Sequence, residues 1–126
     1  MGYLIDSNVL IDYVAERFST QQLLRLDAIL DVELNVSIIV KIETLGFNAP
    51  LNEEQKLVYF FGMANVIALT NDISNLTISL RKTVKLKTPD AIIAATALVH
   101  NHTLLTHNLS DFKNVPNLIV VDPYTL

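Results

Sequence analysis

Short apolar runs alternate with amphipathic segments along the chain, and this alternation predicts strands that alternate with helices. Strand-like runs fall at residues 2–5, 34–37, 65–69, 103–106 and 118–121. They carry few charges, as strands buried on both faces do. The segments between them place apolar residues three and four positions apart, which is the period of a helix with one buried face. The pattern predicts an α/β fold: a three-layer α/β/α sandwich around a mainly parallel sheet of four to five strands.

Local signals predict where the helices begin and end. Capping side chains are expected before five of them: Ser7 or Asn8, Ser19 paired with Gln22, Asn52, Asn71 and Thr88. The start at Thr88 is the clearest, because a proline and then an acid follow the capping hydroxyl. The helix over residues 91–99 is apolar nearly all round and should be buried. A helix over 38–45 should end at Gly46, and residues 106–117 are expected to form a loop.

Composition limits the class of protein. The 126 residues suit one domain spanning 1–126, and 51% apolar residues suffice for a core. The chain has no cysteine, which excludes disulfides and thiolate zinc sites. Its beginning lacks the basic region of a signal peptide, and its apolar runs are too short to span a bilayer. We therefore expect a soluble, intracellular, cytoplasmic protein with no membrane partner.

Four acidic residues lie at the ends of apolar segments spread over the whole chain: Asp6, Glu43, Asp90 and Asp111. A carboxylate beside a core element is costly unless it is paired, hydrogen-bonded or bound to a metal. Sites in open α/β sheets form beyond the carboxyl ends of the strands, where these acids are expected to meet. A pocket of carboxylates without thiols favours a hard divalent cation.

Each acid also has an ordinary explanation. Asp6 could end a strand or cap a helix, and Asp90 could serve only the helix dipole. Glu43 could be a solvated helix acid and Asp111 a loop acid. It is the recurrence of acids at similar structural positions that favours a shared pocket.

The charge balance argues mildly against non-specific binding of nucleic acid. The net charge is −4, although carboxylates that hold a cation account for part of that sum. Basic residues gather just before Asp90: Arg81, Lys82, Lys85 and Lys87. This cluster is either a solvated helix end or a phosphate contact.

Four segments of the chain read as sequence motifs: residues 6–10, Asp-Ser-Asn-Val-Leu, and residues 37–45, 89–98 and 104–112. Together they resemble the PIN domain family, and VapC-type toxins in particular. Residues 6–10 resemble its opening motif, and residues 37–45 resemble its second, which carries a glutamate. Residues 89–98, Pro-Asp-Ala-Ile-Ile-Ala-Ala-Thr-Ala-Leu, are the most similar segment. Residues 104–112, which include Thr106, Asn108, Asp111 and Phe112, resemble its ending. The motifs occur in the family's order and cover essentially the whole chain.

The resemblance implies a Mg²⁺- or Mn²⁺-dependent endoribonuclease, usually the toxin of a type II toxin–antitoxin pair. Such proteins are typically homodimers, and a small antitoxin inhibits them by occupying the active-site groove. Asp6, Glu43 and Asp90 match the family's three core acids. Many relatives have a fourth acid where this chain has the neutral Asn108, so Asp111 would have to serve a second metal position.

Roles for the site residues follow from this resemblance and from their chemistry. Asp6 and Asp90 would bind the metal directly, and Glu43 directly or through water, so that a bound water is activated. Asn8 is a candidate for orienting a carboxylate or the phosphate, and the Thr106 hydroxyl for holding Asp6 or a water. Lys85 and Lys87 are the candidates for contact with the RNA backbone.

Other functions remain open at this point. A haloacid-dehalogenase-like phosphatase needs a second aspartate where this chain has Asn8, and a response-regulator receiver needs a phosphoacceptor where Asp72 fits helix capping better. A PIN-like module that binds RNA or protein with weak or no catalysis is the main alternative. His100-Asn101-His102 spells the letters of another nuclease motif, but Asn101 is better explained as a helix C-cap.

Two amphipathic helices carry more apolar area than a small domain needs to cover its own core. They are expected over residues 19–34 and 52–64. Part of this area is predicted to be buried by a second copy of the chain or by the antitoxin.

Overall fold

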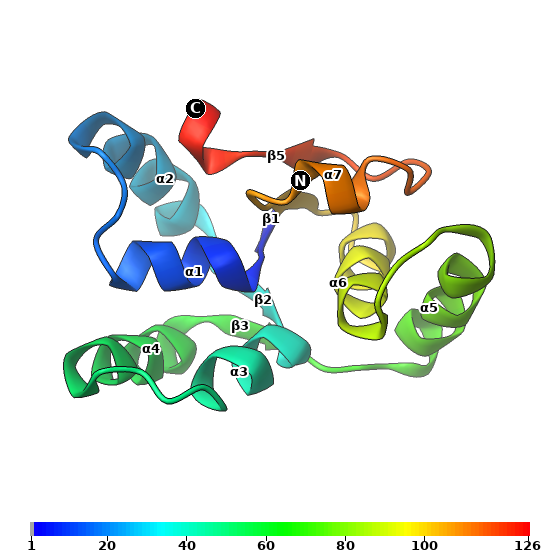
Figure 1. Ribbon diagram of the computed structural model, residues 1–126, viewed down its shortest axis with the longest axis horizontal. Helices are drawn as coiled ribbons and strands as arrows, with labels where there is room; N and C mark the ends of the chain where they lie inside the picture. The colour runs from blue at the N-terminus through cyan, green and yellow to red at the C-terminus, as the bar shows by residue number, and fades with distance from the viewer. Residues whose placement is uncertain (1) are drawn as a thin grey trace.

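The computed structural model describes residues 2–126, in which five short strands alternate with seven α-helices and a final 3₁₀ turn (Figure 1). In chain order the elements are β1 (Tyr3–Ile5), α1 (Ser7–Val14), α2 (Thr20–Val32), β2 (Asn35–Ser37), α3 (Ile38–Leu45), α4 (Leu51–Met63), β3 (Asn65–Ile67), α5 (Asn71–Thr83), α6 (Thr88–Val99), β4 (Thr103–Leu105), α7 (Leu109–Phe112), β5 (Val120–Val121) and η1 (Pro123–Thr125).

The strands form one sheet in the order β3-β2-β1-β4-β5, and every neighbouring pair is parallel. The register aligns Ile5 at the end of β1 with Leu105 at the end of β4. Leu105 is aligned in turn with Val121 at the end of β5. The segments that follow these strands therefore leave the sheet at the same edge, which we call the carboxyl edge. The predicted parallel α/β fold is confirmed.

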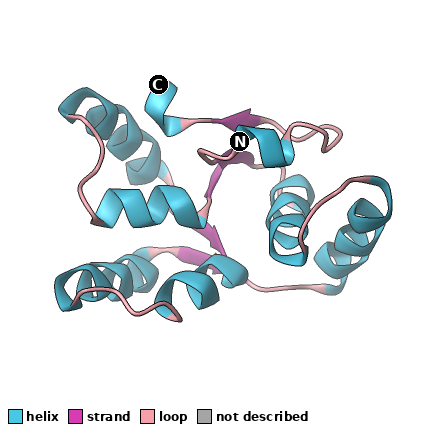
Figure 2. Ribbon diagram, in the orientation of Figure 1, coloured by secondary structure: helices cyan, strands magenta, loops and turns pink. Residues whose placement is uncertain are grey.

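Helices cover both faces of the sheet, which makes the expected three layers (Figures 1 and 2). Helices α1, α2 and α4 lie on one side, and α5 and α6, which pack against each other, lie on the other. Helix α3 contacts α1, α4 and α6, so it connects the two sides near the carboxyl edge. Residues 91–97 of α6 are all buried, as the continuous apolar run predicted.

The capping box of Ser19 and Gln22 is present, but four of the five expected caps are wrong in detail. Helix α1 is capped by the Asp6 side chain instead of Ser7 or Asn8. Helix α5 is capped by Thr70, one residue before Asn71. Pro50 and Lys87 precede α4 and α6 without a side-chain cap, so Asn52 and Thr88 lie inside their helices. Proline sets the backbone direction at both starts, which lessens the need for a capping hydroxyl.

Segment boundaries otherwise agree to within a few residues. Gly46 ends α3, and Asn101 adopts a positive φ of 55° just after α6, as expected of a residue that ends a helix. The segment 106–117, expected to be a loop, contains the short helix α7. Among residues 2–126 there is no helix with the length and apolarity that crossing a membrane requires.

Candidate active site

Asp6 is the central side chain of the carboxyl edge. It follows β1 and caps α1, so its carboxylate lies where a strand ends and a helix dipole begins. The residue is only 3% exposed. One oxygen, Oδ1, accepts a hydrogen bond from the Ser7 backbone N–H at 2.8 Å. The other, Oδ2, accepts from the Thr106 hydroxyl at 2.7 Å and from the Asn8 side-chain amide at 3.2 Å.

Thr106 and Asn8 are themselves held in place. The Thr106 Oγ1 accepts hydrogen bonds from Asn8 Nδ2 at 3.2 Å and from the Asn108 backbone N–H at 3.1 Å. The Asn8 Oδ1 accepts from the His107 backbone N–H at 3.0 Å. The donor side of the Asn8 amide is thereby turned toward Asp6. Both residues hydrogen-bond to the Asp6 carboxylate, which is one of the two contacts expected for each of them.

Glu43 reaches the same edge from α3. Its Oε1 lies 3.5 Å from the Ser7 hydroxyl, which is also 3.4 Å from Asp6 Oδ1. Ser7 therefore stands between the two carboxylates. Its own role was not predicted, although it occupies the variable hydroxyl position of the opening motif. Ile42, beside Glu43, is 62% exposed, so this turn of α3 is open to solvent on one side.

The four acids are linked through their effects on pKa values. Burial raises the pKa of Asp6, against the opposing effect of its hydrogen bonds. Burial raises the pKa of Glu43, and the charges of Asp6 and Asp90 raise it further. Burial also raises the pKa of Asp90, with added contributions from Asp6 and Asp111, while Lys87 opposes the shift. Mutual repulsion of this kind requires the carboxylates to lie near one another.

Within residues 2–126, no basic side chain forms an ion pair with the cluster. The ion pairs there are Arg17–Asp12 and Lys56–Glu16, and the His107 ring hydrogen-bonds to Asp122, so none of these contacts includes the four acids. Asp6 is thus a buried carboxylate whose hydrogen-bond partners are all neutral. Such a group is costly to ionise without a cation.

The carboxylate oxygens at this edge suit a hard cation, but they do not by themselves enclose one. Among the described residues, no three acidic or imidazole side chains converge into a complete ligand cage. Mg²⁺ does not need such a cage, because it keeps several waters and is commonly held by one or two carboxylates. The oxygen-only donors and the uncompensated charge fit an ion of this kind.

The remaining predicted residues are placed less centrally. Lys87 precedes α6 and is close enough to Asp90 to affect its pKa. Lys85 is exposed on the connection between α5 and α6. Asn108 contributes its backbone N–H to Thr106 and makes no side-chain cap for α7. Asp111 is exposed in α7, and its link to the cluster is its effect on Asp90.

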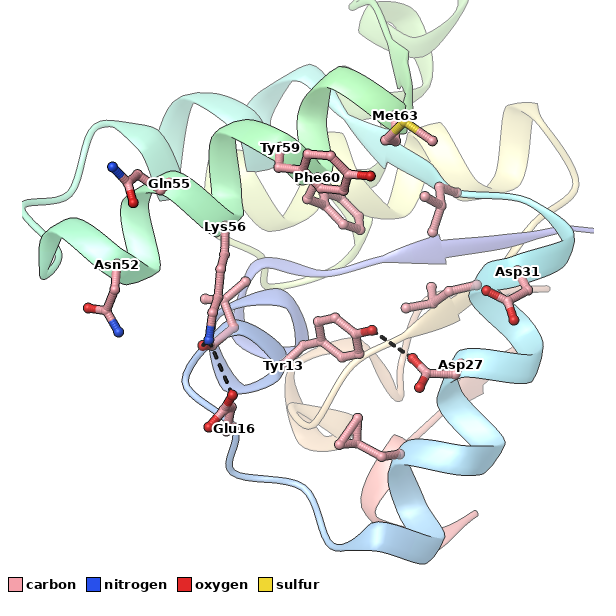
Figure 3. Close-up of a pocket in the computed structure, with 14 residues that line it drawn as sticks. Tyr13, Glu16, Asp27, Asp31, Asn52, Gln55, Lys56, Tyr59, Phe60 and Met63 are labelled. Carbon is pink, nitrogen blue, oxygen red and sulfur yellow. Dashed lines mark hydrogen bonds and ion pairs between the residues drawn. The ribbon is translucent and has the colours of Figure 1, made fainter.

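A large hollow lies elsewhere, between α2 and α4 (Figure 3). This α2–α4 groove measures about 780 Å³. Its apolar lining includes Leu23 and Leu30 from α2, and Tyr59, Phe60 and Met63 from α4. Tyr59 is 73% exposed and Met63 is 63% exposed, so this lining is open to solvent.

Charges along the groove are unequal. Glu16, Asp27 and Asp31 line it with a single cation, Lys56. The Lys56 ammonium is 3.3 Å from Glu16 Oε1, and the Tyr13 hydroxyl donates to Asp27 Oδ1 at 2.6 Å (Figure 3). Burial and this hydrogen bond raise the pKa of Tyr13 to about 12, so the phenol keeps its proton. The α2 wall of the groove is therefore acidic. The helical periods of the sequence indicate this apolar area but not the cavity, because the cavity depends on the spacing of two helices.

Known proteins resemble the chain over nearly its full length. It is 28% identical to ribonuclease VapC1 of Rickettsia felis, with 96% of each protein covered. A toxin–antitoxin complex from Klebsiella pneumoniae contains a chain 32% identical, with 98% of both covered and a TM-score of 0.78. VapBC-1 from nontypeable Haemophilus influenzae matches at 23% identity and a TM-score of 0.80, with 98% of both covered, which supports the fold.

A family model matches most of the chain. The PIN domain model matches residues 3–118, which include β1 and its Asp6, α3 with Glu43, α6 with Asp90, and α7 with Asp111. The chain belongs to the PIN domain family.

Proposed function

We propose that this protein is a metal-dependent endoribonuclease, and that it is the toxin of a toxin–antitoxin pair. The observation that carries the proposal is Asp6: a buried carboxylate, oriented by neutral donors and surrounded by acids, with no cation paired to it. The likeness to ribonuclease VapC1 of Rickettsia felis supports RNA as the substrate class.

The hydrogen bonds assign different roles to the two oxygens of Asp6. Oδ2 accepts from both Thr106 and Asn8, which occupies its two lone-pair directions. Oδ1 has one short bond, from the Ser7 N–H, and a long one of 3.4 Å from the Ser7 hydroxyl, which a cation could replace. Asp6 would therefore bind Mg²⁺ or Mn²⁺ through Oδ1 alone. Asp90 would be the second direct ligand and Glu43 a ligand directly or through water, while Asp111 would be needed for a second ion.

A bound Mg²⁺ or Mn²⁺ would lower the pKa of a water and stabilise charge on the leaving oxygen. The protein supplies the geometry for this. Thr106, Asn8 and Ser7 fix the Asp6 carboxylate before substrate arrives, so no reorganisation is needed at the moment of reaction. Lys87, beside Asp90, is placed to contact an RNA phosphate, and Lys85 extends the same positive segment.

The first experiment compares Asp90→Asn with Asp72→Asn. Each aspartate lies in the first turn of a helix on the same side of the sheet, but only Asp90 is coupled to Asp6. We expect Asp90→Asn to lower Mg²⁺- or Mn²⁺-dependent RNA cleavage by a factor of about 100 or more, and Asp72→Asn to leave it unchanged. Equal activity of the two variants would contradict the mechanism.

Thermal melting distinguishes this proposal from a module that binds without catalysis. A cation that binds only the folded state raises the melting temperature with its concentration. We expect Mg²⁺ to raise the melting temperature of the wild-type protein and of Asp72→Asn, and to have a smaller effect on Asp90→Asn. Absence of both metal-dependent stabilisation and cleavage in the wild type would favour the binding module.

We propose further that the α2–α4 groove holds an amphipathic helix of the antitoxin. Its open apolar lining matches the apolar face of such a helix. The acidic wall formed by Asp27 and Asp31 favours a helix that carries lysine or arginine beside that face. The toxin–antitoxin complexes among the structural neighbours support a protein partner of this class.

The expected homodimer also stays a proposal. Exposed apolar side chains outside the groove, including Ile42, Phe47 and Ile78, offer area for a second copy of the chain. Sedimentation of the free protein tests this directly, because a strictly monomeric mass at high concentration would contradict it.

A further inference from the structure

His107 occupies a distinctive place on the carboxyl edge. It follows Thr106, whose hydroxyl holds Asp6, and its own backbone N–H holds Asn8. It lies two residues beyond the end of β4. This place is beside the end of β5, because the Thr106 N–H donates to the Val121 carbonyl at 3.0 Å. The backbone of His107 therefore adjoins the residues that hold Asp6, and its side chain is not part of the acidic cluster.

The imidazole of His107 is fixed by the C-terminal segment. Its Nδ1 lies 3.1 Å from Oδ2 of Asp122, and its ring meets the Tyr124 ring edge-on with centroids 5.0 Å apart. Asp122 is only 8% exposed, and its other oxygen accepts from the Tyr124 N–H at 3.0 Å. The ring is thus held from two sides although 58% of the side chain is exposed.

The hydrogen bond to Asp122 selects one tautomer of the neutral His107 ring. A carboxylate can only accept hydrogen bonds, so the proton lies on Nδ1 and Nε2 is left as an acceptor. No residue among 2–126 hydrogen-bonds to Nε2. In the neutral ring, Nε2 is therefore a fixed and exposed acceptor at the carboxyl edge.

We propose that His107 is a specificity-determining residue that accepts a hydrogen bond from a ribose 2′-hydroxyl near the scissile phosphate. The inference rests on the proposed ribonuclease function. A 2′-hydroxyl is a donor that RNA has and DNA lacks, so a fixed acceptor at this place favours RNA. A phosphate oxygen is itself only an acceptor and gains nothing from the lone pair of Nε2. A site that is built to accept a hydrogen bond discriminates against a ligand without the donor.

The test is a set of binding measurements in the Asp90→Asn background, which suppresses cleavage. A short RNA substrate is compared with copies that carry a single 2′-deoxy nucleotide at successive positions around the cleavage site. We expect deoxy substitution at one position to weaken binding by a factor of about 3–10, the size of one hydrogen bond. His107→Ala should weaken binding of the all-ribose RNA by a similar factor.

The decisive readout combines the two changes. In His107→Ala the sensitive 2′-deoxy substitution should have no further effect, because the acceptor is already gone. His107→Gln, whose side-chain oxygen can accept, should restore part of the sensitivity. A residue that only anchored the C-terminal segment could change the melting temperature, but it would leave the sensitivity to the 2′-hydroxyl intact.

Three results would overturn the inference. His107→Ala could weaken RNA and the matching DNA equally, which would indicate a phosphate contact. The deoxy effect could persist in full in His107→Ala, which would place the 2′-hydroxyl reader elsewhere. A wild-type protein that neither binds nor cleaves RNA would contradict the ribonuclease proposal itself, and this inference with it, whereas the first two results leave that proposal intact.

Discussion

The carboxyl edge and the α2–α4 groove both carry a free-energy cost in the free protein, but the cause differs: uncompensated charge at the edge, and exposed apolar area in the groove. At the carboxyl edge, Asp6, Glu43 and Asp90 hold negative charge at a free-energy cost, as their raised pKa values show. In the groove, side chains such as Tyr59 and Met63 leave apolar area in contact with water. A cation would offset the first cost and a protein segment the second.

The two surfaces also differ in rigidity. Asp6 is fixed by backbone and side-chain hydrogen bonds that link β1, α1 and β4. The groove lining is held mainly by its helices, with the Tyr13–Asp27 and Lys56–Glu16 contacts at its rim. We infer that the edge is preorganised for chemistry, while the groove can adjust to the shape of a partner. Mutations should therefore separate catalysis from partner binding.

Among substitutions outside the acidic cluster, the largest effect is expected from Thr106→Val, which removes the hydroxyl that orients Asp6. The change also deprives the Asn8 amide and the Asn108 N–H of an acceptor in a fully buried position. We expect RNA cleavage to fall by a factor of about 10–100, and stability to fall by about 1–3 kcal/mol. Single-turnover kinetics and urea unfolding measure the two.

Thr103→Val is the matched control, because Thr103 is a buried threonine of β4, three residues before Thr106, without a role at Asp6. It should retain the cleavage rate. If Thr106→Val cleaved as fast as this control, preorganisation of Asp6 by the hydroxyl would be wrong.

A smaller effect, on partner binding alone, is expected from Tyr59→Ala in the groove. Exposed aromatic side chains commonly supply much of the energy of an interface. Binding of the antitoxin should weaken by a factor of about 10, while metal-dependent cleavage and the melting temperature of the free protein stay the same. Titration calorimetry measures the affinity.

Leu24→Ala serves as the control for this prediction. Leu24 lies on α2 and is 67% exposed, but it does not line the groove. Its removal should leave antitoxin affinity unchanged. Equal losses in the two variants would show that the partner covers a different face of α2.

The smallest effect is expected from Glu43→Gln without metal. The pKa of Glu43 is raised above its ordinary 4.5, so the folded state binds its proton more tightly than the unfolded state does. The stability that this residue contributes is present below pH 4.5 and is lost as pH rises through the folded pKa. At pH 7 the substitution should therefore raise the melting temperature by about 1–3 °C, a value reduced for solvent screening.

The rise in melting temperature should disappear near pH 3, where Glu43 is protonated in the folded and in the unfolded state. In Mg²⁺ the substitution should lower the melting temperature instead. Glu54→Gln on α4 provides a comparison, because Glu54 lies in a first helical turn where its charge is favourable. That control should gain no stability at pH 7. A Glu43→Gln variant that is less stable at pH 7 in EDTA would argue against charge repulsion at the edge.

Much of the fold could be predicted from the sequence because the signals are local. Strand-like runs with few charges, the capping box at Ser19 and the apolar α6 segment predicted the parallel sheet and its covering helices. The errors at Asn52, Asn71 and Thr88 arose where proline or a neighbouring residue set the helix start. Helix α7 was missed because four residues, Leu109–Phe112, are too few to show a period.

For the site, the sequence by itself determined which residue types were present and in which order they left the strands. That was enough to indicate one acidic cluster and to suggest Asn8 and Thr106 as its supports. The tertiary structure alone decided that Ser7 stands between Asp6 and Glu43, that Asp122 fixes the His107 ring, and that α2 and α4 leave an open groove. The reason is physical: these features depend on distances between segments far apart in the chain, which packing sets and no local pattern encodes.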